Sequence, residues 1–104
     1  MDILTGNGAA AFGEIAPRFA RITDEILFAD IWQRPDLSLR DRSLITVAAL
    51  IALDRNAQLP FHLHTALSHG VSQAELVELI THLAFYSGWP TAASAFKSLK
   101  TLTP

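Results

Sequence analysis

The side chains best suited to acid–base or metal chemistry are four histidines, His62, His64, His69 and His82. His62 and His64 stand two positions apart, so on a helix they would point to nearly opposite sides and could not share a metal ion. His62 and His69 would share a face but lie two turns apart, roughly 10 Å along the helix axis, which is too far to chelate one ion directly. Cysteine is absent, so no thiolate ligand is available either. We therefore expect no metal site.

His62 has neighbours that could tune an imidazole for proton transfer. Gln58 lies one helical turn before it, and Phe61 and Leu63 flank it with apolar bulk. A histidine half-buried among apolar groups can act as a general acid or base near neutral pH. The alternative is a core histidine whose hydrogen bond is satisfied, and the residues alone leave both interpretations open.

Arg42 is the second candidate. It precedes an uncharged run over residues 43–53, so its guanidinium is expected to be partly buried and to need an anion beside it. A structural partner could be Asp41, Asp36 or Asp24. A functional partner would be a substrate carboxylate, which the planar guanidinium can bind through two parallel hydrogen bonds.

The elements that must position these residues are predicted to be helices throughout. From about Ala9 to Trp32 the apolar residues recur at steps of three and four, and Pro17 interrupts this pattern where a second helix could open. Ser38 with Asp41 resembles a capping box and predicts the start of a helix through the apolar run 44–53. No segment alternates with the period of a strand, so the fold class is all-α.

The second half of the chain predicts three more helices, over residues 61–69, 73–87 and 91–99. Gly70 is placed to close the first of them in the left-handed conformation. Ser72 with Glu75 forms a capping box for the second. Residues 88–90 are expected to form a turn. The predicted core face of the middle helix consists of Leu76, Leu79, Ile80, Leu83 and Phe85.

Length and composition favour one domain over residues 1–104, with a flexible start over residues 1–8. The chain has 104 residues, of which 50% are hydrophobic and 17% charged, enough for one core without disulfides. The mean hydropathy of +0.28 is high for a small monomer and favours a homo-oligomer in which apolar surface meets another subunit.

Charge and hydropathy argue against nucleic acid and membrane partners. Residues 66–83 have the spacing of a helix-turn-helix, but no lysine or arginine occurs between Asn56 and Phe96, and the net charge is −2. The uncharged helical run 43–53 has 11 residues, well short of the roughly 20 that span a bilayer. The N-terminus lacks the basic segment of a secretory leader, so we expect a cytoplasmic protein.

Several motifs together resemble the carboxymuconolactone decarboxylase family, within the alkylhydroperoxidase D-like superfamily. The resemblance covers about residues 17–99 and is carried by Arg34-Pro35, Arg42–Thr46, Leu59–His62, Ala66-Leu67, Gly70-Val71 and Thr81–Pro90. It implies an alkylhydroperoxidase D-like helical domain of about six helices, assembled into trimers or hexamers with active sites near subunit contacts.

The thiol peroxidases of the same superfamily use a Cys-x-x-Cys pair, a histidine and a glutamate. Counted from His62, the two cysteine positions fall on Arg55 and Gln58, and the glutamate position falls on Ser43. Dithiol reduction of a peroxide is therefore excluded.

Arg42-Ser43, just before the apolar run 44–53, resembles the decarboxylase branch of the family instead. In that branch acidic residues are typical where residues 56–58 stand, and arginines where Pro60 and His64 stand. Because those arginines would anchor carboxylates, their replacement leaves the substrate open. A different small carboxylate or lactone, or a non-catalytic oligomeric binding protein, is the alternative to the namesake activity.

The resemblance also implies roles. In 4-carboxymuconolactone the departing carboxylate is vinylogous to the lactone carbonyl, which takes up the electron pair, so no cofactor is needed. Arg42 would orient a carboxylate, His62 would be the general acid, and Gln58 or Ser43 would donate to the developing oxyanion. Tyr86 and Trp89 bracket the Gly88 turn, where such side chains serve packing, subunit contacts or ligand binding. With His82 they are the candidate substrate-binding residues.

Overall fold

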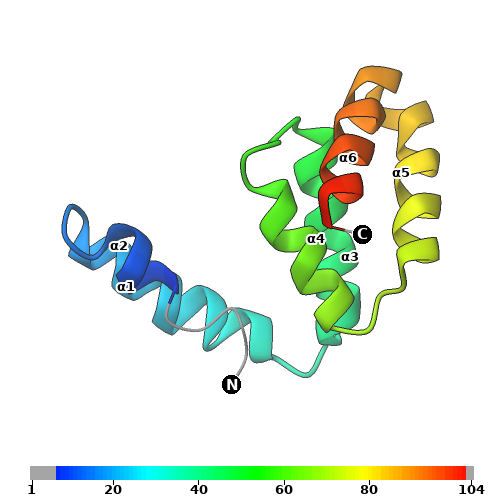
Figure 1. Cartoon of the computed structure of the whole chain (residues 1–104). Coiled ribbons are helices and arrows are strands. Elements are labelled where there is room, and N and C mark those ends of the chain that lie inside the picture. The colour runs from blue at the N-terminus through cyan, green and yellow to red at the C-terminus, as the bar shows by residue number, and fades with distance from the viewer. Residues whose placement is uncertain (1–6, 103–104) are drawn as a thin grey trace. The chain divides into compact units, whose positions relative to one another are not determined.

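The computed structural model describes residues 7–102, all of whose regular elements are helices, and this confirms the all-α class. The chain divides into two compact units, Met1–Leu39 and Arg40–Pro104 (Figure 1). Of the predicted flexible start, residues 1–6 lie outside the described residues, and the first helix begins at Asn7. The assignment of residues 1–104 to one domain stays a prediction.

The first unit is a helical hairpin. Its elements are α1 (Asn7–Phe12), α2 (Pro17–Ile22), the π-helix η1 (Thr23–Phe28) and the 3₁₀-helix η2 (Ile31–Gln33). Pro17 opens α2, as predicted, because a proline in the first turn sacrifices no helical hydrogen bond. The Asp24 carboxylate accepts hydrogen bonds from the amides of Gly8 (2.7 Å) and Ala9 (3.0 Å), and thereby holds the start of α1 against η1.

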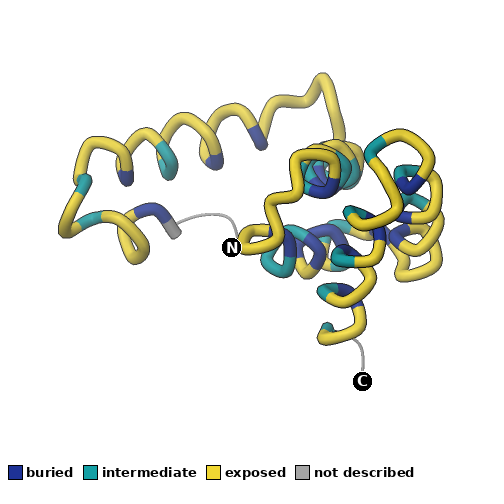
Figure 2. Tube along the Cα trace, turned by 90° about the horizontal axis from the view of Figure 1, so that it is seen from above, coloured by how far each residue is buried: buried dark blue, intermediate teal, exposed yellow. Residues whose placement is uncertain are grey.

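This hairpin exposes much of its apolar surface (Figure 2). The rings of Phe12 and Phe19 meet edge to face at 5.0 Å, but both remain largely exposed. Large apolar side chains of the hairpin that are more than a third exposed are Phe12, Ile15, Phe19, Ile22, Ile26, Leu27 and Ile31. Exposed apolar side chains that lie close together often mark surfaces that contact another protein.

The second unit is built from four helices that run alternately up and down (Figure 1). They are α3 (Leu39–Ala52), α4 (Leu59–Ser68), α5 (Gln73–Ser87) and α6 (Trp89–Leu102), with α6 packed against both α4 and α5. Buried residues recur three or four positions apart on each helix, so every helix turns one apolar stripe inward. The core consists of Val47, Ile51, Leu59, Leu63, Ala66, Val71, Leu76, Ile80, Ala84, Ala92, Ala95 and Leu99.

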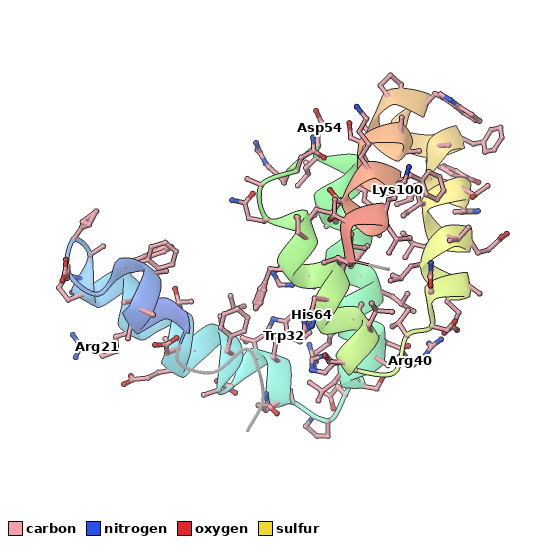
Figure 3. The ribbon with its side chains drawn as sticks, viewed as in Figure 1. Arg21, Trp32, Arg40, Asp54, His64 and Lys100 are labelled. Carbon is pink, nitrogen blue, oxygen red and sulfur yellow. The ribbon has the colours of Figure 1, made fainter. Side chains whose placement is uncertain are left out.

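The start of α5 follows the cap that the sequence predicts for it. The Ser72 hydroxyl accepts from the amide of Glu75 (3.1 Å), and the Glu75 carboxylate accepts from the amide of Ser72 (2.9 Å), which completes the predicted capping box at the start of α5. Gly70 closes α4 with a φ of +95°. The Arg40 guanidinium, labelled in Figure 3, pairs with Glu75 and links the first turns of α3 and α5.

Two expectations for this unit were wrong. Phe85 is 78% exposed, because the inward stripe of α5 continues from Leu76 and Ile80 to Ala84. Residues 88–90 do not form a separate turn: Gly88 makes the change of direction alone, with a φ of +106° that a residue with a Cβ rarely adopts. Trp89 therefore already begins α6, and Pro90 sits in its first turn.

None of the helices in the described part of the chain combines the length and the apolar character needed to cross a bilayer.

The capping box yields a stability prediction. Ser72→Ala removes the acceptor for the Glu75 amide and should lower the free energy of unfolding by about 1 kcal/mol. Ser72→Asn keeps a capping oxygen and should lose much less. Urea unfolding followed by circular dichroism measures both, and equal losses in the two variants would contradict a capping role.

Candidate functional site

The clearest polar contact near the predicted site joins α3 to α4. The Ser43 Oγ lies 2.9 Å from the Nδ1 of His69, and the Ser43 side chain is buried, with 1% of the residue exposed. Sequence reasoning placed Ser43 in the site but gave His69 no role. The available signal was helical spacing, since His69 follows His62 by two turns and shares its face of α4.

His62 is half-buried on α4, and its Nδ1 is shielded from solvent. Its ring stacks on Phe61, with centroids 4.9 Å apart and planes 10° apart. Burial lowers the pKa of His62 below 6.5, because a partly apolar environment disfavours the charged imidazolium. His62 therefore has the partly apolar surroundings that the sequence predicted.

Arg42 lies in the first turn of α3, half-buried and with its Nε shielded from solvent. Its carbonyl accepts from the Thr46 hydroxyl at 2.8 Å. Three carboxylates are possible structural partners of Arg42, and each also has another contact. Asp41 lies 3.5 Å from Arg40, Asp36 lies 3.7 Å from Arg34, and Asp24 accepts from the first amides of α1.

The antiparallel course of α3 and α4 orders these residues along the pair. Ser43 meets His69 at one end, and the Arg55 amide donates to the Leu50 carbonyl (2.8 Å) near the other. His62 precedes His69 by two turns, so helical rise places it roughly 10 Å closer to the N-terminal end of α4. Gln58 is exposed and directly precedes α4, one turn before His62. The order along α4 is thus Gln58, His62, His69, with Arg42 at the His69 end.

The three predicted substrate-binding residues lie where α5 ends and α6 begins. The His82 and Tyr86 rings stack with centroids 4.9 Å apart, and Tyr86 is 77% exposed. Trp89 meets Phe85 edge to face at 6.4 Å. Trp89 also lines an apolar cavity of about 220 Å³, formed with Thr81, Ala84, Ala92, Ala93 and Phe96. The structure brings His82 and Tyr86 together, whereas Trp89 faces this separate cavity.

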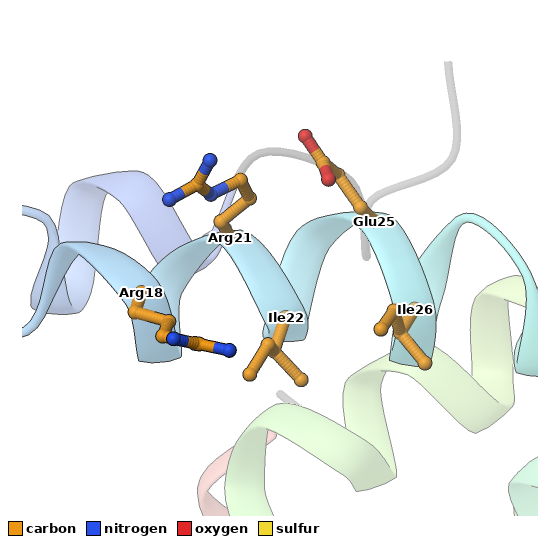
Figure 4. A pocket seen from close by; sticks show the side chains of 5 residues that line it. All are labelled: Arg18, Arg21, Ile22, Glu25 and Ile26. Carbon is orange, nitrogen blue, oxygen red and sulfur yellow. The ribbon is translucent and has the colours of Figure 1, made fainter.

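A different cavity, of about 470 Å³, lies on the first unit along α2 and η1 (Figure 4). Arg18, Ile22 and Ile26 point to one side of the helix there, and Arg21 and Glu25 point to the other. None of the residues predicted to do chemistry lines it. Within residues 7–102, no group of three or more histidine, aspartate or glutamate side chains is arranged to hold a metal ion.

Comparison with known proteins matches residues 17–101 to the model of the carboxymuconolactone decarboxylase family. The chain is 38% identical over 77 residues to a 4-carboxymuconolactone decarboxylase of Acinetobacter baylyi, a match that covers 74% of this chain and 58% of that protein. It is 32% identical over 84 residues to a nitrosuccinic acid decarboxylase of Metarhizium robertsii, covering 77% of this chain and 59% of that protein. The chain thus spans a little under three fifths of the length of these relatives.

Proposed function

Because the chain belongs to the carboxymuconolactone decarboxylase family, we propose that it is a carboxy-lyase that needs no cofactor and acts on a small molecule carrying at least two carboxylates. The observation that carries this proposal is the half-buried His62, with its lowered pKa, in a chain whose relatives are named as decarboxylases. A 4-carboxymuconolactone-like lactone is the first candidate substrate.

The names of the two relatives point to one chemistry. In 4-carboxymuconolactone the departing carboxylate is vinylogous to the lactone carbonyl, and in nitrosuccinic acid one carboxyl group sits on the carbon that bears the nitro group. Each molecule thus carries an oxygen-bearing acceptor for the electron pair, and each retains a second carboxylate. A different acyclic or cyclic substrate of this class is the alternative, and the nitrosuccinic acid relative favours it.

The proposed reaction needs only groups that this chain supplies. The bond to the carboxylate breaks, carbon dioxide leaves, and the electron pair moves into the carbonyl or nitro oxygens. The imidazolium of His62 then donates its proton to carbon and takes another from solvent. A lowered pKa makes that imidazolium a stronger acid, and the anionic substrate favours its protonated form.

Arg42 and Gln58 are the proposed partners of His62. Arg42 holds the carboxylate that the substrate retains. Its half-buried side chain lies at the His69 end of the α3–α4 pair, whereas His62 lies nearer the N-terminal end of α4. Gln58 donates to the oxyanion, because it is exposed one turn from His62, whereas Ser43 is buried and bonded to His69. His82 and Tyr86, whose rings stack, are the proposed contacts for the apolar part of the substrate, and Trp89, which lines the separate cavity, is a further candidate.

We also propose that the protein is a homo-oligomer, a trimer or hexamer. Support comes from the exposed apolar surface of the α1–η1 hairpin and from Phe85, Tyr86 and Trp89, each at least 70% exposed. Apolar side chains so exposed on a small chain are typical of surfaces that meet another subunit.

His62→Ala should lower turnover of the substrate by roughly 10²–10⁴-fold without unfolding the protein, because it removes the proton donor.

In the unsubstituted enzyme kcat/KM should fall tenfold per pH unit above an inflection that lies below pH 6.5, since only the imidazolium can donate and burial lowers its pKa. Ultraviolet absorbance during decarboxylation of 4-carboxymuconolactone and related lactones measures both effects.

Ser68→Ala is the control for this experiment, since Ser68 is exposed on the same helix and has no proposed role. An unchanged rate in His62→Ala would remove His62 from the mechanism. No turnover across the lactones and nitrosuccinate, together with no bound small molecule in native mass spectrometry, would favour the non-catalytic binding protein.

Arg42→Gln should raise KM by about 10- to 100-fold and change kcat much less, because the retained carboxylate is held equally in the bound substrate and the transition state. Steady-state kinetics separate the two parameters. Arg55→Gln, at an exposed position in the α3–α4 connection, should match the unsubstituted enzyme. If both arginine variants had the same KM, Arg42 would not be the anchor.

Light scattering on the purified protein should give a mass of three or six copies. Ile26→Glu, which places a charge on the exposed hairpin surface with no lysine or arginine within four residues along the chain, should shift that mass toward smaller species because a buried charge without a partner opposes association. Glu25→Gln, a change of charge at an exposed position of the same hairpin, is the control. A monomer in the unsubstituted protein would refute the assembly.

A further inference from the structure

The hydrogen bond between Ser43 and His69 lies one residue from the proposed carboxylate anchor. We propose that His69 is a positioning residue: through its contact with Ser43 it fixes the first turns of α3 and so holds the Arg42 guanidinium where it binds the substrate carboxylate. This inference rests on the proposed function for the role of Arg42, but the link from His69 to Arg42 is a property of the fold and can be tested without a substrate.

Burial shows that Ser43 acts on the structure rather than on a ligand. Among the described residues, the buried polar side chains are Ser43 and Thr65. The Thr65 hydroxyl bonds to the Phe61 carbonyl of its own helix at 3.0 Å, whereas the Ser43 hydroxyl bonds to a side chain 26 residues away on another helix. A buried hydroxyl needs a partner, because leaving it unsatisfied costs about 1–3 kcal/mol. Ser43 therefore ties α3 to α4.

Because Ser43 is adjacent to Arg42, its hydrogen bond to His69 affects the orientation of Arg42 on α3. Successive residues on an α-helix are rotated by about 100°, so fixing the Ser43 side chain against His69 fixes the direction in which the adjacent Arg42 leaves α3. Four residues later along the same face, Val47 is fully buried in the core. Val47 and Ser43 together prevent this part of α3 from rotating about its axis.

Backbone hydrogen bonds at the C-terminus of α4 fix the position of His69. It caps the C-terminus of α4, and its amide donates to the carbonyls of Thr65 (2.9 Å) and Ala66 (3.2 Å). Gly70 then reverses the chain, and the Val71 amide returns to the Ala66 carbonyl at 2.9 Å. The contact with Ser43 also survives either tautomer, because a hydroxyl can donate to a bare Nδ1 or accept from a protonated one.

The test compares His69→Ala with His69→Asn. Asparagine places an amide atom close to the position of Nδ1 and can bond to Ser43, whereas alanine cannot. We expect His69→Ala to raise KM about tenfold with kcat within about twofold, and His69→Asn to restore KM to within about twofold. In an Arg42→Gln background, His69→Ala should raise KM no further, because the anchor is already gone. Ser68→Ala, at an exposed position of α4, is the control.

A second readout does not depend on turnover. The ¹⁵N order parameter of the Arg42 Nε–H group, assigned by its loss in Arg42→Gln, should fall in His69→Ala and in Ser43→Ala, and recover in His69→Asn. A His69→Ala protein with a lower Tm but unchanged KM and unchanged Arg42 order would overturn the inference. A loss of Arg42 order in a protein that decarboxylates nothing would support the link from His69 to Arg42 and refute the proposed function instead.

Discussion

Four apolar helix stripes bury one another in the second unit, and every polar group of the candidate site must be accommodated at the edge of that core. Val47, Leu59, Leu63 and Ile80 are all fully buried, so no room remains among them for an uncompensated charge. Half-buried positions such as those of Arg42 and His62 are where a polar group keeps a charged or protonatable head and still loses most of its water. The site is thus a consequence of where the core ends.

The same partial burial changes the acid–base behaviour of the His62 imidazole. Desolvation lowers the pKa of His62 by disfavouring its charged form, and the ring stacks on that of Phe61. A group that gives up its proton readily is what a decarboxylation requires once carbon dioxide has left, because the remaining step is protonation of carbon. Membership of the carboxymuconolactone decarboxylase family and this local environment are the two supports of the proposed decarboxylation.

The first unit buries much less apolar surface than the second. Its hairpin is closed by hydrogen bonds from the α1 amides to Asp24 and by one aromatic contact, while few of its side chains are buried. A hairpin of two short helices buries too little apolar area to offset the entropy of ordering its backbone. Its exposed isoleucines and phenylalanines, together with the high mean hydropathy of the chain, are the observations that support the proposed homo-oligomer.

The sequence by itself determined the features that depend on neighbouring residues. Caps and breakers placed the start of α2 at Pro17 and the bounds of α5 after Ser72, and the motif spacing around His62 identified the family. Only the tertiary structure decided which side chains meet. Phe85 has the hydrophobicity of a core residue, yet the small Ala84 occupies the inward position. His69 carries no local signal for its contact with Ser43, since that contact exists only because α3 and α4 run antiparallel with one register, which is set by packing across the whole core.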